Sequence, residues 1–113
     1  MKRDPRLYLD DIIQAIAAIE RYTQGLTKQD FDQNELVQDG VLRRLEVIGE
    51  AARHIPQELQ TQAPEIPWRR IVGMRNRLTH EYFGILIDRV WNVVQQDLPP
   101  LRSKIQELRE ALD

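Results

Sequence analysis

Residues 67–82 have the sequence PWRRIVGMRNRLTHEY and predict one helix that runs from Pro67 to about Tyr82. Apolar side chains recur in it at the three-to-four spacing of a helix with one buried face, at Trp68, Ile71 and Leu78. The same stripe passes through Arg75 and Tyr82. Burying an unpaired guanidinium costs several kcal/mol, about 3–5 when a partner is missing, so Arg75 must face a partner, a cleft or an interface.

Polar residues gather beside Arg75 on this helix. Asn76 and His80 form an i,i+4 pair, and Gly73 lies one turn earlier. Arg75 and His80 can both carry positive charge. Together with the Asn76 amide and the Tyr82 phenol, they lie near one helix end. This arrangement indicates a functional site.

The sequence before this helix predicts two long helices. Asp4-Pro5 is a typical helix start, and Gly25 closes the first helix. Thr27 with Asp30 resembles a capping box and predicts a short helix or turn up to Asn34. The second long helix is expected from about Glu35 to Ile55. Its apolar stripe consists of Val41, Leu45, Ile48, Ala52 and Ile55.

The remaining segments complete a helical pattern. Residues 56–67 form a connector with one expected helical turn at 57–60, and the helix of residues 67–82 is expected to stop near Gly84. The last segment, 87–112, again shows helical spacing, with a kink or a restart expected at Pro99-Pro100. No strand-like alternation occurs. We therefore expect an all-α fold, an antiparallel bundle of four to five helices, in a single domain over residues 1–113.

Composition narrows the function classes. The chain has 113 residues, no cysteine and a net charge of −2, so cysteine chemistry is excluded and any attraction to nucleic acid must be local. No apolar run approaches the roughly 18–20 residues of a membrane span. The first residues lead directly into a charged amphipathic pattern instead of a secretory signal. We expect a cytoplasmic protein without contact to a membrane.

The sequence gives little support for a metal site or for a serine nucleophile. The only histidines are His54 and His80. Glu46 and Glu50 precede His54 at four-residue steps, but a di-metal bundle needs Glu-x-x-His pairs and further inward carboxylates, so we interpret them as a solvated charged face. Ser103 is the only serine and has no nearby base, which argues against a serine nucleophile. We expect no metal and no cofactor.

Arginines gather just before and within the octapeptide of residues 75–82. The four arginines between Trp68 and Arg77 are accompanied by no acidic residue; they are Arg69, Arg70, Arg75 and Arg77. Three more on the preceding helix would extend this patch if the two helices pack together: Arg43, Arg44 and Arg53. An arginine cluster by itself is more often a solvated face than a binding site. The place of Arg75 on the apolar stripe favours binding, with Arg69, Arg70 and Arg77 as candidate RNA contacts.

His80 is the best acid–base candidate, because an imidazole with an ordinary pKa of about 6.5 exchanges protons near neutrality. Cleaving RNA needs a base for the 2′-hydroxyl, an acid for the leaving 5′-oxygen and a cation for the phosphorane charge. One chain offers one such histidine and Arg75, which is half of that set. A two-fold dimer would supply both halves. On the residues alone, a structural role for this pair is equally open.

The motif R-x-x-x-x-H-x-Y, matched by Arg75, His80 and Tyr82 with Asn76 after the arginine, resembles the HepT-like toxins of the HEPN ribonuclease superfamily. Further stretches are similar to that family. They are RLYLDDI at residues 6–12, EVIGEA at residues 46–51 and PWxxxxGMRN at residues 67–76. The resemblance therefore covers most of the chain.

This resemblance implies a metal-independent endoribonuclease that acts as a toxin. It implies a HEPN-like homodimer in which both chains contribute Arg75, Asn76 and His80 to one RNA-cleaving cleft. It also implies a partner, a minimal nucleotidyltransferase antitoxin, that inactivates the toxin by transferring AMP to Tyr82. The alternative from another class is a non-catalytic helical module that binds a protein or RNA through its arginines. Without the resemblance, Tyr82 would be interpreted as a buried or interface aromatic.

Overall fold

The computed structural model describes the backbone of residues 3–80 and 84–112, and the side chains of residues 3–74 and 87–112. The elements in chain order are α1 (Pro5–Thr23), α2 (Lys28–Asp32), α3 (Glu35–Arg53), α4 (Gln57–Gln62), α5 (Trp68–His80), α6 (Gly84–Asn92), the π-helical turn η1 (Val93–Asp97) and α7 (Leu98–Ala111). Every regular element in this described part is helical. The expected all-α fold is confirmed.

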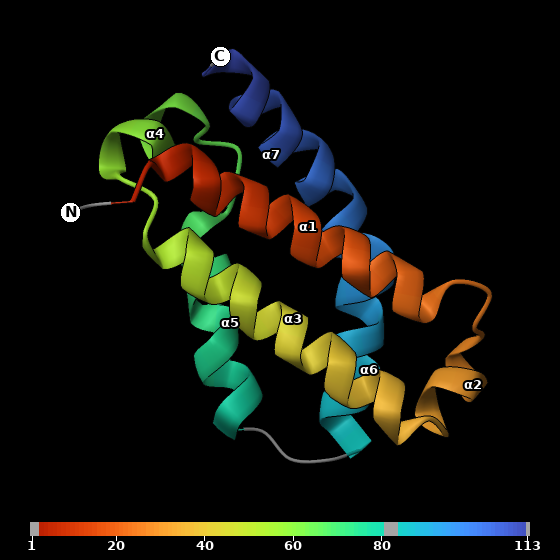
Figure 1. Ribbon diagram of the computed structural model, residues 1–113. Coiled ribbons are helices and arrows are strands. Elements are labelled where there is room, and N and C mark those ends of the chain that lie inside the picture. Colours follow the sequence, from red (N-terminus) through yellow and green to blue (C-terminus); the bar gives the residue numbers. More distant parts are fainter. Residues whose placement is uncertain (1–2, 81–83, 113) are drawn as a thin grey trace.

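Helix α1 is the centre of the bundle. It lies between α3 and α7 and runs antiparallel to both, and α5 packs on α3 at the side away from α1 (Figure 1). The apolar stripe expected along residues 35–55 is buried. Ile16 of α1, Leu45 of α3 and Ile105 of α7 have no exposed surface. The buried residues of α1, α3, α5 and α7 belong to one core cluster, which gives the catalytic candidates on α5 a rigid support.

Local capping signals explain where the helices begin. The Asp4 side chain accepts a hydrogen bond from the Arg6 backbone N–H at the start of α1. Hydrogen bonds from the Arg6 side chain and backbone lower the pKa of Asp4 to about 2. Thr27 and Asp30 form the reciprocal capping box at α2. Gly25, with φ of 77°, takes the left-handed conformation after α1. These sequence predictions are confirmed.

The segment after α5 differs in part from expectation. Gly84 is the first residue of α6, where a helix end was expected. Pro99 and Pro100 lie in the first turn of α7, where a missing backbone N–H is tolerated, and the backbone stays helical from η1 into α7. The kink or restart expected at this pair corresponds to the change from a π-helical to an α-helical turn. The π-helical turn itself, η1, was not foreseen. No helix in the described parts of the chain is both long enough and apolar enough to cross a membrane.

Two contacts hold the elements on either side of the motif. Trp68 is buried at the start of α5, and its Nε1 donates a hydrogen bond to the Ala63 carbonyl oxygen at 3.1 Å. The ring of Phe31 on α2 lies against Trp91 of α6, with 5.2 Å between ring centroids. The beginning of α5 and the end of α6 are therefore both fixed to the bundle.

Candidate active site on helix α5

Helix α5 carries most of the candidate residues. Its backbone is helical through Arg75, Asn76, Arg77 and His80, as the sequence predicted. The side chains of these four residues lie outside the described part, and so does the whole of Tyr82. The site can therefore be built from helical positions and from the described residues around them.

The positions on α5 divide the candidates between two faces. Positions 76 and 80 lie seven and eleven residues after position 69, which is almost two and about three full turns of the helix. The three positions therefore fall on one stripe, which also contains Gly73. Position 75 lies about 140° around the axis from position 80 and about 7.5 Å along it. Histidine and arginine thus occupy different faces of one helix.

Gly73 leaves an open space in the middle of the stripe that contains His80. A Cβ atom added at Gly73 would meet no described atom within 4 Å. Arg69, one turn before Gly73, is exposed. The described part of the chain therefore leaves room for a side chain or a neighbouring surface at Gly73.

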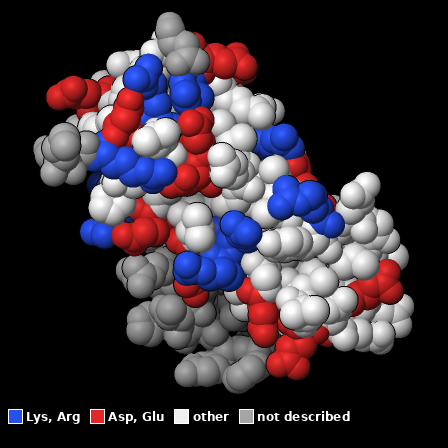
Figure 2. Space-filling model, viewed as in Figure 1, with Lys and Arg blue, Asp and Glu red and all other residues white. Residues whose placement is uncertain are grey.

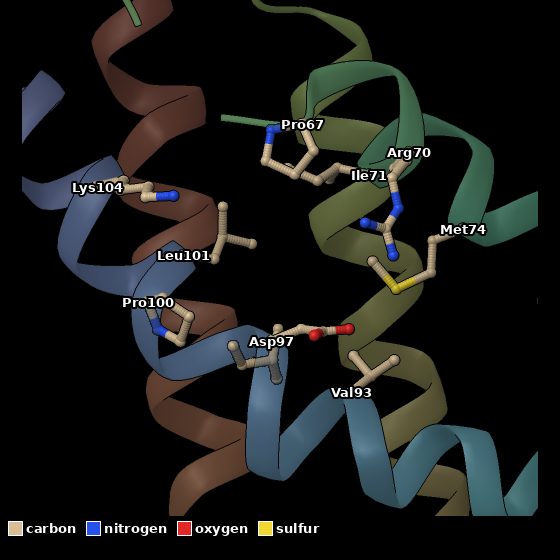
Figure 3. A pocket seen from close by; sticks show the side chains of 10 residues that line it. Pro67, Arg70, Ile71, Met74, Val93, Asp97, Pro100, Leu101 and Lys104 are labelled. Carbon is tan, nitrogen blue, oxygen red and sulfur yellow. The ribbon is translucent and has the colours of Figure 1, made fainter. Parts of the chain in front are cut away.

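A groove of about 220 Å³ opens on a neighbouring face of α5. Its floor is apolar, and its lining residues come from the end of the connector and α5, from η1 and from α7 (Figure 3). Arg70, Asp97 and Lys104 extend into it from these three elements. Arg70 was predicted as an RNA contact, but the groove was not foreseen, because its opposite wall lies about thirty positions later in the chain.

The arginines of α3 do not extend the patch on α5. Arg43 pairs with Glu46 at 3.5 Å, and Arg53 pairs with Glu50 at 2.7 Å. Arg44 donates a hydrogen bond to the hydroxyl oxygen of Tyr22 on α1. Positive and negative side chains are interleaved over the visible face of the molecule (Figure 2). The hypothesis of an extended basic surface is therefore wrong, since α3 turns these side chains toward α1 and toward their own acidic neighbours.

The other histidine lies in a different, mixed-charge groove between α1 and α3. The His54 ring stacks on Tyr8 with 4.9 Å between centroids, and its Nε2 lies 3.2 Å from a Glu50 carboxylate oxygen. Arg3 covers the other side of this region, 4.7 Å from the Tyr8 ring centroid. The described residues contain no cluster of three or more potential metal ligands. His54 therefore takes part in local packing against Tyr8 and in a contact with Glu50.

The HepT-like family model, described as ribonuclease HepT-like, matches residues 12–108. The chain belongs to this family. The matched region includes the whole of α5 and every residue of the motif, so the HepT-like assignment rests on the same segment as the candidate site.

Named relatives support the HepT-like assignment. A protein of Thermococcus cleftensis named "Probable ribonuclease HepT" is 42% identical over 110 residues, which cover 97% of this chain and 100% of the relative. A protein of Methanocaldococcus jannaschii, named both as a gamma-glutamylcyclotransferase and as a "putative RNase", is 39% identical over the full chain. This chain spans only 51% of that longer relative. None of the solved structures matches the HepT-like chain.

Proposed function

We propose that this HepT-like protein is the toxin of a toxin–antitoxin module and a metal-independent endoribonuclease that acts in the cytosol. The observation that carries the proposal is the family match across the motif, together with a continuous helix α5 that holds Arg75, Asn76 and His80. A core anchored by Trp68 and Ile71 keeps this helix in place. Arg69, Arg70 and Arg77 would contact the RNA backbone.

Helix geometry favours a site shared by two copies. Positions 75 and 80 are about 140° apart around α5, so one helix presents an arginine and a histidine in different directions. A second copy related by a two-fold axis supplies its own His80 and Arg75 to the same RNA-cleaving cleft. The open stripe at Gly73 gives two such helices room to approach each other.

The chemistry needs only proton transfer and charge stabilisation. The imidazole of one His80 removes the proton of a ribose 2′-hydroxyl, whose oxygen attacks the adjacent phosphorus atom. Arg75 and the Asn76 amide donate hydrogen bonds to the phosphorane oxygens. The protonated His80 of the partner gives its proton to the leaving 5′-oxygen. The products are a 2′,3′-cyclic phosphate and a 5′-hydroxyl.

A cleavage assay in EDTA tests this function directly. Purified protein is incubated with a panel of tRNAs and mRNAs, and the ends of the products are mapped. We expect 2′,3′-cyclic phosphate ends, and no cut at a position where the ribose is replaced by 2′-deoxyribose. Cleavage of the deoxy-substituted strand would contradict attack by the 2′-hydroxyl. Binding without cleavage of any RNA would favour the non-catalytic module.

Mixed dimers test whether the site is shared. Arg75→Ala and His80→Ala homodimers should each be nearly inactive, because each lacks one essential group in both halves. A mixed dimer keeps one native Arg75 and one native His80 in the shared cleft, so it combines charge stabilisation with one of the two proton transfers, which neither parent does. We expect co-expressed, differently tagged chains purified as mixed dimers to recover activity at least about tenfold above either parent. Mixed dimers as inactive as the parents would argue against a shared site.

We also propose that a partner enzyme regulates the ribonuclease by modifying it. A minimal nucleotidyltransferase antitoxin would direct the Tyr82 phenol oxygen to attack the α-phosphorus of ATP. Pyrophosphate leaves, the phenol proton goes to solvent or a base, and AMP remains attached through a phosphodiester. The added phosphate and adenine compete with RNA for the arginines of α5 and block its approach.

Tyr82→Phe should escape this control. The substitution removes only the hydroxyl group, so the variant should stay toxic when the antitoxin is co-expressed, whereas wild type is silenced. Intact-mass spectrometry should show added AMP on wild type and none on the variant. Tyr22→Phe is the matched control and should still be modified and silenced. If the antitoxin silences Tyr82→Phe without modifying it, inhibition works by occlusion of the cleft.

A further inference from the structure

The groove between α5, η1 and α7 contains charged groups that have no partner among the described residues. Among the described residues, Arg70, Asp97 and Lys104 make no hydrogen bond or ion pair, although all three line this groove. Some charged residues elsewhere are paired. Lys28 pairs with Asp32 and with Asp88. The groove thus offers two cationic donors and one carboxylate acceptor to a ligand.

The carboxylate is placed there by the π-helical turn. Asp97 ends η1 and occupies the N-cap position of α7, but its side chain makes no capping hydrogen bond. A capping side chain normally accepts a hydrogen bond from the N–H of the second or third helical residue, but these are Pro99 and Pro100, which have no N–H. π-helical turns often occur at functional sites, because the extra residue re-aims side chains. Figure 3 shows the Asp97 carboxylate extending into the groove.

The small volume and the apolar floor of the groove favour a ligand with a flat ring. Its volume of about 220 Å³ lies below the roughly 300–1,000 Å³ of pockets that hold drug-sized ligands. Ile71 and Leu101 are buried in its floor, and Met74 and Pro67 add further apolar surface. A splayed RNA base presents such a ring, and arginine guanidinium planes commonly stack on it.

The groove also lies on the path that RNA would follow to the proposed site. Position 77 is seven residues after Arg70, almost two full turns, and therefore continues the same line along α5, beside the stripe that contains His80. The groove residue Met74 directly precedes Arg75. A strand whose phosphates contact arginines on this line can place a neighbouring base in the groove.

We propose that this groove binds one guanine base of single-stranded RNA and sets the sequence preference of cleavage; this inference rests on the proposed function. Guanine is the base whose Watson–Crick edge offers two adjacent N–H groups, N1–H and the N2 amino group, to one carboxylate, here Asp97. Its O6 accepts a hydrogen bond from Lys104. The base lies on the apolar floor, and the Arg70 guanidinium covers its other face or contacts its phosphate.

A nucleotide titration tests the groove without any cleavage. ¹⁵N-labelled wild-type dimer is titrated separately with the 5′-monophosphates of guanosine, adenosine, cytidine and uridine. We expect guanosine monophosphate to shift the amide signals of Met74, Asp97 and Lys104 and to bind at least about tenfold more tightly than the other three. Asp97→Asn should lose this preference by about tenfold or more, because the amide cannot accept two N–H groups. Asp39→Asn, an exposed change on α3, is the control and should keep it.

Two outcomes overturn the proposal. One is the absence of shifts at the groove, and the other is equal binding of the four nucleotides or an Asp97→Asn variant that discriminates as wild type does. Sequencing of cleavage products adds a second readout. Wild type should show guanine enriched at one fixed offset from the cut, and Asp97→Asn should reduce that enrichment at least about tenfold. If no RNA is cleaved, the proposed ribonuclease function fails, whereas the titration still decides whether guanine binds.

Discussion

His80→Ala is expected to reduce RNA cleavage in EDTA by about 10²- to 10⁴-fold, whereas His54→Ala should leave it unchanged. A positioned proton donor or acceptor contributes about that much to a reaction rate. The two histidines are a matched pair, because each lies at or near the C-terminal end of a helix in the same chain. The measurement is the single-turnover cleavage rate of one labelled RNA by each purified variant.

The His54 control separates chemistry from folding. His54 stacks on Tyr8 and contacts Glu50, so its removal perturbs surface packing on α3 without touching α5. Circular dichroism and melting temperature should show both variants folded. Equal cleavage by wild type and His80→Ala would remove His80 from the mechanism. An equal loss in both histidine variants would indicate that the assay reports folding.

Gly73→Leu is expected to convert the proposed dimer to a monomer and to abolish cleavage while leaving the fold intact. An added Cβ at Gly73 meets no described atom within 4 Å, so the single chain can accept a side chain there. Replacing a helical glycine by a good helix former even adds about 0.5–1 kcal/mol of stability. In the proposed dimer, the leucine would separate the two α5 helices and break up the shared site.

Light scattering, melting temperature and cleavage rate are measured together for this variant. Gly40→Ala is the contrasting control, because its Cβ would lie 3.3 Å from the Tyr22 ring between α1 and α3. It should alter stability and leave the dimer intact. If Gly73→Leu remains a dimer with full activity, the two-fold contact does not run along the stripe that contains Gly73 and His80.

The sequence predicted those parts of the fold that local chemistry determines. The Asp4 cap, the Thr27–Asp30 capping box and the buried stripe of α3 all depend on residues within a few positions of one another. The connector also followed its local pattern, although its turn at 57–60 extends to the six-residue helix α4. Recognition of the motif predicted the family in the same way, from a contiguous segment.

Features that depend on three-dimensional neighbours were missed. The sequence suggested that arginines on α3 would join those on α5, but Arg43 and Arg53 find carboxylates three residues away on their own helix. The turn η1 was not predicted, because the buried Val90, Val94 and Leu98 keep a spacing of four that an ordinary α-helix also allows. The place of Asp97 in the groove depends on α5, η1 and α7 together, which no local sequence pattern indicates. The roles of Arg75, Asn76, His80 and Tyr82 stay predictions.

The anchoring contacts on either side of the motif also provide the chain with two intrinsic fluorophores, its only tryptophans. Trp68 is 7% exposed and hydrogen-bonded through its indole, so its emission should be blue-shifted and insensitive to quenchers in water. Trp91 is half-buried beside Phe31 and should respond more strongly. Single-tryptophan variants would therefore report separately on the segments before and after the motif, without an attached dye, as RNA or a second subunit binds.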